Sequence, residues 1–91
     1  MDDLREALAD AAYRVSGHAA DQMVAEGLDE IWVLEATIGG VAVEEFPATF
    51  PHPSCLVAGQ PAAGRGIHAL WAYDHPSGYA MLLTVYRADR G

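Results

Sequence analysis

The spacing of hydrophobic residues changes near residue 40 of the chain. Up to that point, apolar side chains recur three and four positions apart, which is typical of amphipathic helices. Beyond it, short runs of apolar and β-branched residues are separated by segments rich in glycine and proline, which is typical of strands and turns. Helices followed by strands predict an α+β fold, with the helices packed on an antiparallel sheet.

Two or three helices are predicted in the first part. The first spans residues 2–12, and Ser16 and Gly27 bracket the second as its N-cap and its terminating glycine. Asp29 caps the third, which ends at Gly39. Residues 13–16 are too few to assign. The side of the second helix that we expect to be buried consists of Ala19, Ala20, Met23 and Val24.

Four strands are predicted in the second part, over residues 41–46, 54–59, 67–74 and 78–88. Their short connections favour an antiparallel meander. We therefore expect one domain over residues 1–91, with a helical part over 1–40 and a four-stranded antiparallel sheet over 41–89.

The last two strands are expected to form a hairpin with a three-residue loop, 75–77, followed by Gly78 in a left-handed conformation. This register places Asp74 opposite Gly78 and His68 opposite Thr84, and Tyr86 then shares the face of His68. The other face would carry Ile67, Ala69, Trp71 and Tyr73 together with Met81, Leu83 and Val85.

The charge distribution restricts the possible partners. The chain has 13 acidic residues, five arginines and no lysine, giving a net charge of −8. No lysine or arginine lies between Val15 and Gly64. An acidic surface repels phosphate, which opposes broad nucleic-acid binding. Such a surface serves either solubility or docking to a basic protein.

The compartment is predicted from what the sequence contains. A single cysteine, Cys55, excludes an internal disulfide, and burial as an inert thiol is favoured over a nucleophilic role. The chain has no apolar run long enough to span a membrane, and its acidic start is unlike a secretory signal. We expect a cytoplasmic protein that does not bind membranes.

The first candidate for chemistry is a stripe on the second helix. His18, Gln22 and Glu26 are four residues apart and so lie on one side of that helix. His18 could be a general acid or base or a phosphate contact, or it could be a packed histidine without a chemical role. Gln22 and Glu26 are expected to face solvent.

The second candidate is the group formed by His68, Thr84 and Tyr86 on one face of the predicted hairpin. These side chains can build a proton-transfer site, with Arg65 holding an anion beside it. They can equally form a hydrogen-bonded core group. The histidines lack metal-ligand spacing and no glycine-rich phosphate loop is present, so neither a metal nor another cofactor is expected.

Five ordered motifs carry a resemblance to a known family. In chain order they are GHAADQM…GL, VEEFP, PSCLVAG, GRGIHALWAYD and LLTVYRAD. Over residues 10–89 the chain resembles the bacterial domain of unknown function family 4258, which is distantly similar to RelE-like and BrnT-like toxins. That likeness implies helices packed on an antiparallel sheet and, in some relatives, RNA cleavage.

The family pattern falls on His18, Met23, Arg65, His68, Thr84 and Tyr86. Where the resemblance implies arginine on the helix, this chain has Gln22 and Glu26. Losing two phosphate contacts weakens RNA binding.

Three functions follow as alternatives. The first is a non-catalytic module that binds an antitoxin-like or basic protein. The second is a metal-independent endoribonuclease toxin with His68 or His18 as acid/base, Tyr86 assisting and Arg65 on the phosphate. The third is a small-molecule binder that uses the same face. The sequence favours the first.

Overall fold

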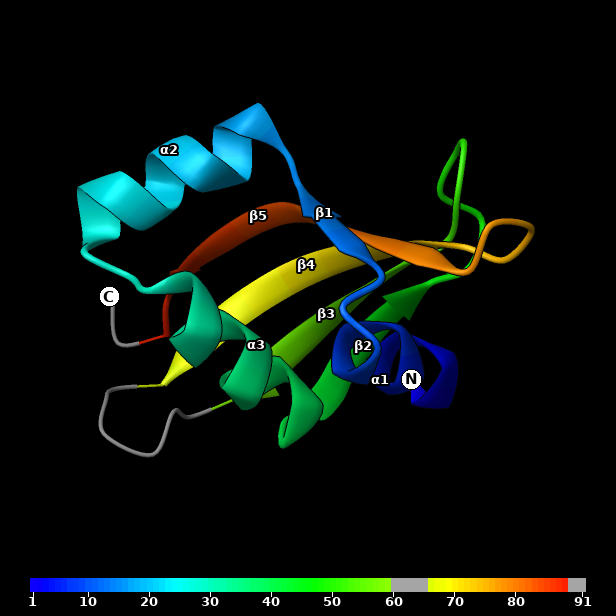
Figure 1. The fold of residues 1–91 in the computed structure, drawn as a ribbon, viewed down its shortest axis with the longest axis horizontal. Coiled ribbons are helices and arrows are strands. Elements are labelled where there is room, and N and C mark those ends of the chain that lie inside the picture. The colour runs from blue at the N-terminus through cyan, green and yellow to red at the C-terminus, as the bar shows by residue number, and fades with distance from the viewer. Residues whose placement is uncertain (60–65, 89–91) are drawn as a thin grey trace.

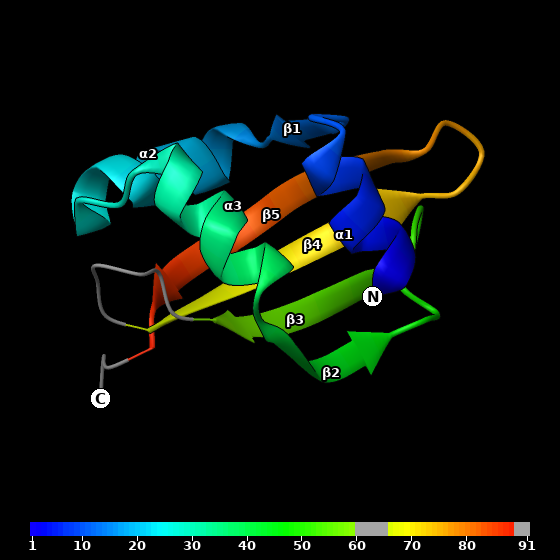
Figure 2. The same cartoon turned by 60° about the horizontal axis from the view of Figure 1, so that its bottom comes forward.

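A computed structural model describes residues 1–59 and 66–88 (Figure 1). The elements, in chain order, are α1 (Asp2–Ala9), β1 (Tyr13–Val15), α2 (Gly17–Glu26), α3 (Glu30–Ile38), β2 (Val41–Phe46), β3 (Ser54–Gly59), β4 (Ile67–Asp74) and β5 (Tyr79–Arg87). The strands form one sheet in the order β1-β5-β4-β3-β2. Helices α1 and α3 lie on the same side of the sheet, while α2 runs alongside β5 (Figures 1 and 2).

The α+β class is confirmed, but the four-stranded antiparallel sheet was wrong in two respects. The described sheet has five strands, and it is mixed, because β1 pairs parallel with β5. Tyr13 lies opposite Ala80 and Val15 lies opposite Leu82. Three residues are too few to show a two-residue period, so the pattern of the sequence could not reveal this strand.

The predicted helix boundaries hold except at the end of α1. Ser16 Oγ accepts a hydrogen bond from the Ala19 amide at 3.0 Å, and Gly27 ends α2 with a φ of 67°. The α1 helix stops at Ala9 instead of continuing to residue 12. Ala11 has a φ of 59°, and its amide turns back to the helix by bonding to the Leu8 carbonyl oxygen at 3.1 Å.

The predicted buried side of α2 was half right. Ala19 and Met23 are buried, whereas Ala20 is exposed and Val24 is 84% exposed. The reason is the position of α2, which lies beside β5 where that strand extends beyond its pairing with β1 (Figure 1). A helix at a sheet edge buries a narrower stripe than a helix that lies flat on the sheet.

The core lies between α1, α3 and one face of the sheet. Its largest member is Trp71, which is 1% exposed. The Trp71 indole donates to Thr37 Oγ1 at 3.0 Å, and that hydroxyl donates to the Val33 carbonyl oxygen at 2.8 Å. This chain of hydrogen bonds fixes α3 against β4 without leaving the buried indole N–H unpaired.

The register of the last hairpin was wrong by one residue near its loop. Asp74 pairs with Tyr79, because Gly78 belongs to the loop and its amide bonds back to the Asp74 carbonyl oxygen at 2.8 Å. Trp71 therefore shares its face with Leu82, and the prediction that it shares a face with Met81 and Leu83 was wrong. A bulge after Leu82 then restores the predicted alternation.

Beyond the bulge, His68 pairs with Tyr86 instead of Thr84, and Leu70 pairs with Thr84. The three polar residues still share one face, as predicted, because the loop and the bulge each shift the pairing by one residue.

No helix in the described residues is long and apolar enough to cross a membrane.

Candidate functional site

The sheet face opposite α1 and α3 is not covered by any described helix. We call it the open face, and its side chains come in cross-strand rows from β3, β4 and β5. The residues of the open face are Leu56, Ala58, His68, Leu70, Ala72, Met81, Thr84 and Tyr86. All are half-buried except Ala72, which is 8% exposed. The face is mainly apolar, with polar side chains at the end where β4 begins.

Two of the predicted site residues meet on this face. The rings of His68 and Tyr86 have centroids 5.3 Å apart and an interplanar angle of 80°, which is an edge-on contact. Thr84 lies on the same face, but its hydroxyl donates to Gln22 Oε1 at 2.8 Å. The arrangement places an imidazole and a phenol together on an accessible surface, which is the minimum that proton transfer would need.

Another predicted site residue, His18, does not join this pair. His18 is exposed in the first turn of α2, next to the Ser16 cap that bonds to the Leu83 carbonyl oxygen. The amide of Arg87, the residue after Tyr86 on β5, bonds instead to Glu26 at the far end of the same helix. His18 and Glu26 are eight positions apart, or about 12 Å along the helix axis. Arg65 lies outside the described residues.

The stripe on α2 closes the edge of the sheet. Gln22 Oε1 accepts from the Val85 amide at 3.0 Å, and Glu26 Oε1 accepts from the Arg87 amide at 3.1 Å. These two side chains take the place of a neighbouring strand, because β1 pairs with β5 only as far as Leu82. The prediction that Gln22 and Glu26 face solvent was wrong; both are half-buried and structural.

The charges near His68 do not form a phosphate site among the described residues. Arg87 pairs with Ile67, which is 2% exposed on the helix-covered side. The guanidinium of Arg87 donates to the Glu26 carbonyl oxygen at 3.0 and 2.6 Å, so it is held by the end of α2. Glu44 of β2 pairs with Leu56 and so adds a negative charge to the rim of the open face.

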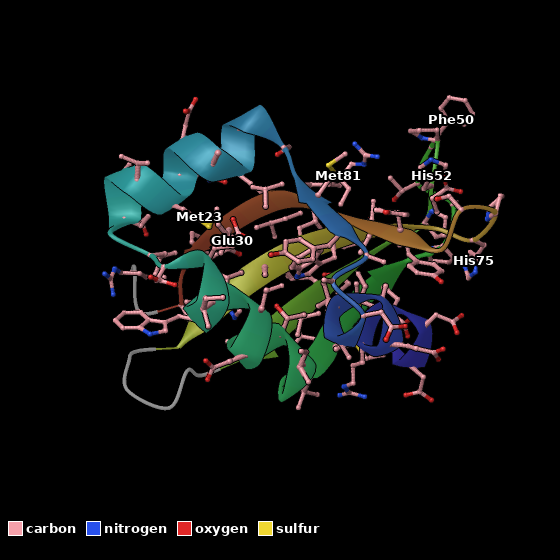
Figure 3. All side chains as sticks on the ribbon, in the orientation of Figure 1. Met23, Glu30, Phe50, His52, His75 and Met81 are labelled. Carbon is pink, nitrogen blue, oxygen red and sulfur yellow. The ribbon has the colours of Figure 1, made fainter. Side chains whose placement is uncertain are left out.

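An apolar hollow lies at the other end of the open face, and no sequence pattern predicts it. It has a volume of about 380 Å³ and is lined by Thr49, Phe50, Pro51, His52, Ala72, Met81 and Leu83. Phe50 is 92% exposed and projects from the proline-rich loop, as Figure 3 shows. The spacing of prolines in a sequence does not show where a loop folds back against a sheet.

Neither metal nor thiol chemistry is supported by the described residues. They contain no group of three or more histidine, cysteine, aspartate or glutamate side chains placed to hold a metal ion. Cys55 is half-buried, and its burial, followed by the nearby Glu45 carboxylate, raises its pKa. A raised pKa lowers the thiolate fraction, as expected for an unreactive cysteine.

Comparison with known proteins gives one family. Residues 15–87 match the family described as "Domain of unknown function (DUF4258)". No curated protein and no solved structure matches the chain.

Proposed function

Since the chain belongs to the DUF4258 family, whose function is unknown, we propose from its own structure that it is a non-catalytic protein-interaction module. The observation that carries the proposal is the open face. Its partner is a protein that covers this apolar surface and carries basic residues at the rim. A single half-buried cysteine fits a reducing, cytoplasmic setting.

The open face has the composition of a binding surface. Leu56, Leu70 and Met81 remain half-buried across three neighbouring strands, and Phe50 stands 92% exposed beside them. Contiguous apolar surface with a polar rim is typical of protein-binding sites. Covering 100 Å² of apolar surface contributes about 2.5 kcal/mol before the costs of association. A partner that covers the face therefore gains binding energy without reshaping the sheet.

The charges favour a protein over RNA. The chain carries a net charge of −8, and the stripe that would have to face phosphate instead bonds to β5 through Gln22 and Glu26. Phosphate binding relies on free cationic side chains, whereas Arg87 is held by the Glu26 carbonyl oxygen. Acidic groups at the rim instead attract a basic protein.

Photo-crosslinking tests the proposal. Benzoylphenylalanine is placed at position 70 of the open face or at position 50 of the neighbouring proline-rich loop, and at position 20 of α2 as the control. The captured protein is purified, and its affinity is measured for the wild type, Leu70→Glu and Ala20→Glu. We expect Leu70→Glu to weaken binding about tenfold or more, as truncation of a central contact does, and Ala20→Glu to leave it unchanged. Equal binding by all three proteins would refute the open face as the docking surface.

The alternative is a metal-independent endoribonuclease of a toxin–antitoxin system, with a RelE-like or BrnT-like arrangement. The observation in its favour is the His68–Tyr86 contact, since a histidine and a tyrosine can exchange protons with a ribose hydroxyl and a leaving oxygen. In this reading His68 is the acid/base and Tyr86 assists, while Arg65, Thr84 and His18 have supporting roles.

RNA cleavage by the purified protein distinguishes the two functions. The interaction module predicts no cleavage by the wild type and no difference in His68→Ala or Tyr86→Phe. Cleavage that falls about 100-fold or more in His68→Ala, while the variant keeps the wild-type melting temperature, would replace our proposal with the endoribonuclease.

A further inference from the structure

The two edges of the sheet are treated differently. At the β5 edge, β1 covers residues 80–82, and the side chains of Gln22 and Glu26 then accept from the amides of Val85 and Arg87. This edge is therefore occupied along much of its length. At the other edge, β2 pairs with β3 and has no second neighbouring strand in the described sheet (Figure 2). Such an edge presents backbone N–H and C=O groups to which another strand can hydrogen-bond.

The exposed side chains of β2 include both apolar and acidic residues. Val41 is 66% exposed and Val43 is 54% exposed. Two exposed acids, Glu44 and Glu45, follow the valines before the strand ends. β-Branched residues favour strand pairing, while carboxylates select the charge of the strand that pairs.

We propose that β2 accepts an extended, basic segment of the partner protein as an additional strand. Main-chain hydrogen bonds to β2 supply the affinity, and arginine or lysine side chains beside Glu44 and Glu45 supply the selectivity. This inference rests on the proposed function, since it states how the partner approaches. Val41 pairs with Ala58, in the row that continues to His68 and Tyr86. The added strand therefore extends the open face.

A second copy of this chain fits the edge poorly. Antiparallel pairing of two β2 strands brings Glu44 and Glu45 of each copy close to the same acids of the other. Like charges at cross-strand distances of about 5 Å destabilise such a pair, and the net charge of −8 on each chain adds to the repulsion.

The test uses synthetic peptides and the whole protein. The probe is a short valine peptide with two adjacent arginines, one for each face of the sheet, because Glu44 and Glu45 lie on opposite faces. It is compared with the same peptide N-methylated at alternate residues and with a version that has glutamate for arginine. Binding is followed by NMR amide shifts and amide exchange. We expect the basic peptide to shift and protect the amides of Val41–Phe46. N-methylation should weaken binding at least tenfold, because it removes hydrogen bonds but keeps the charge. The glutamate peptide should not bind.

Protein variants separate strand addition from simple charge attraction. Glu44→Gln combined with Glu45→Gln should weaken the basic peptide several-fold, whereas Glu35→Gln, an exposed acid on α3, should not. Equal binding of the methylated peptide, equal effects of the two sets of variants, or no binding of any peptide would each overturn the strand addition. None of these results would contradict the proposed function, which the Leu70→Glu affinity tests separately.

Discussion

Replacing Gln22 by methionine tests the conclusion that α2 closes the sheet edge. Methionine keeps the length and the lack of branching of glutamine but removes the acceptor oxygen. In the wild type this one oxygen accepts from Thr84 Oγ1 at 2.8 Å and from the Val85 amide at 3.0 Å. The Thr84 hydroxyl can rotate toward water, but the Val85 amide, in a half-buried setting, loses its partner.

The expected cost follows from that lost partner. A donor left unsatisfied away from water costs about 1–3 kcal/mol, so we expect Gln22→Met to lower the free energy of unfolding by about 2 kcal/mol. For a domain of this size, that corresponds to a fall of roughly 8–16 °C in Tm. Gln22→Glu keeps an acceptor at the same place and should lose less.

Urea denaturation and amide exchange measure both parts of the prediction. Val24→Met is the matched control, because Val24 lies on the same helix and is 84% exposed. We expect the control to change stability by less than about 0.5 kcal/mol. In Gln22→Met the Val85 amide should exchange faster relative to its neighbours. If Gln22→Met matched Val24→Met in stability and kept Val85 protected, the edge-closing role would be wrong.

Three further predictions concern other contacts of the fold. Thr37→Val removes the acceptor of the buried Trp71 indole and should destabilise the protein by about 1–3 kcal/mol in urea, an effect that Thr37→Ser should avoid. Gly59→Ala would place a Cβ 2.0 Å from the Ala36 carbonyl oxygen and should cost at least about 1–3 kcal/mol in thermal melts, whereas Gly17→Ala meets nothing within 4 Å and should be nearly neutral. The hydrogen bond to Glu30, with burial and the Glu30 charge, raises the pKa of Tyr13 above 10.0, so the folded state holds that proton more tightly. Its contribution to stability is complete below pH 10 and is lost as the pH rises through the raised pKa; Glu30→Gln should lower the Tyr13 pKa in an NMR titration, and an unchanged pKa would contradict the assignment.

Local signals in the sequence predicted most of the secondary structure. Ser16 and Asp29 begin helices because their side chains accept hydrogen bonds from backbone amides, and Gly27 ends a helix because it adopts a left-handed conformation. Each of these residues acts only on its own turn. The face shared by His68, Thr84 and Tyr86 was also predicted, although with the wrong partners. Two register shifts, one at the loop and one at the bulge, cancel in their effect on which side chains face the same way.

What the sequence could not predict depends on contacts between distant residues. The role of Gln22 and Glu26 needs the position of α2 relative to β5, some 60 residues later in the chain. Helical spacing shows that the two residues share a side but not what lies beside it. Likewise, nothing local to residues 49–52 predicts that their loop folds against Ala72 and Met81 to form an apolar hollow.

The central claim is that the open face binds a partner protein, and methyl NMR tests it most directly. The protein is labelled on its leucine and methionine methyl groups and mixed with the purified partner from the crosslinking experiment. We predict that the methyl signals of Leu56, Leu70 and Met81 shift most, while those of Leu4 and Leu8, on the buried side of α1, stay in place. Shifts confined to residues on the helix side, with Leu56, Leu70 and Met81 unchanged, would contradict the account.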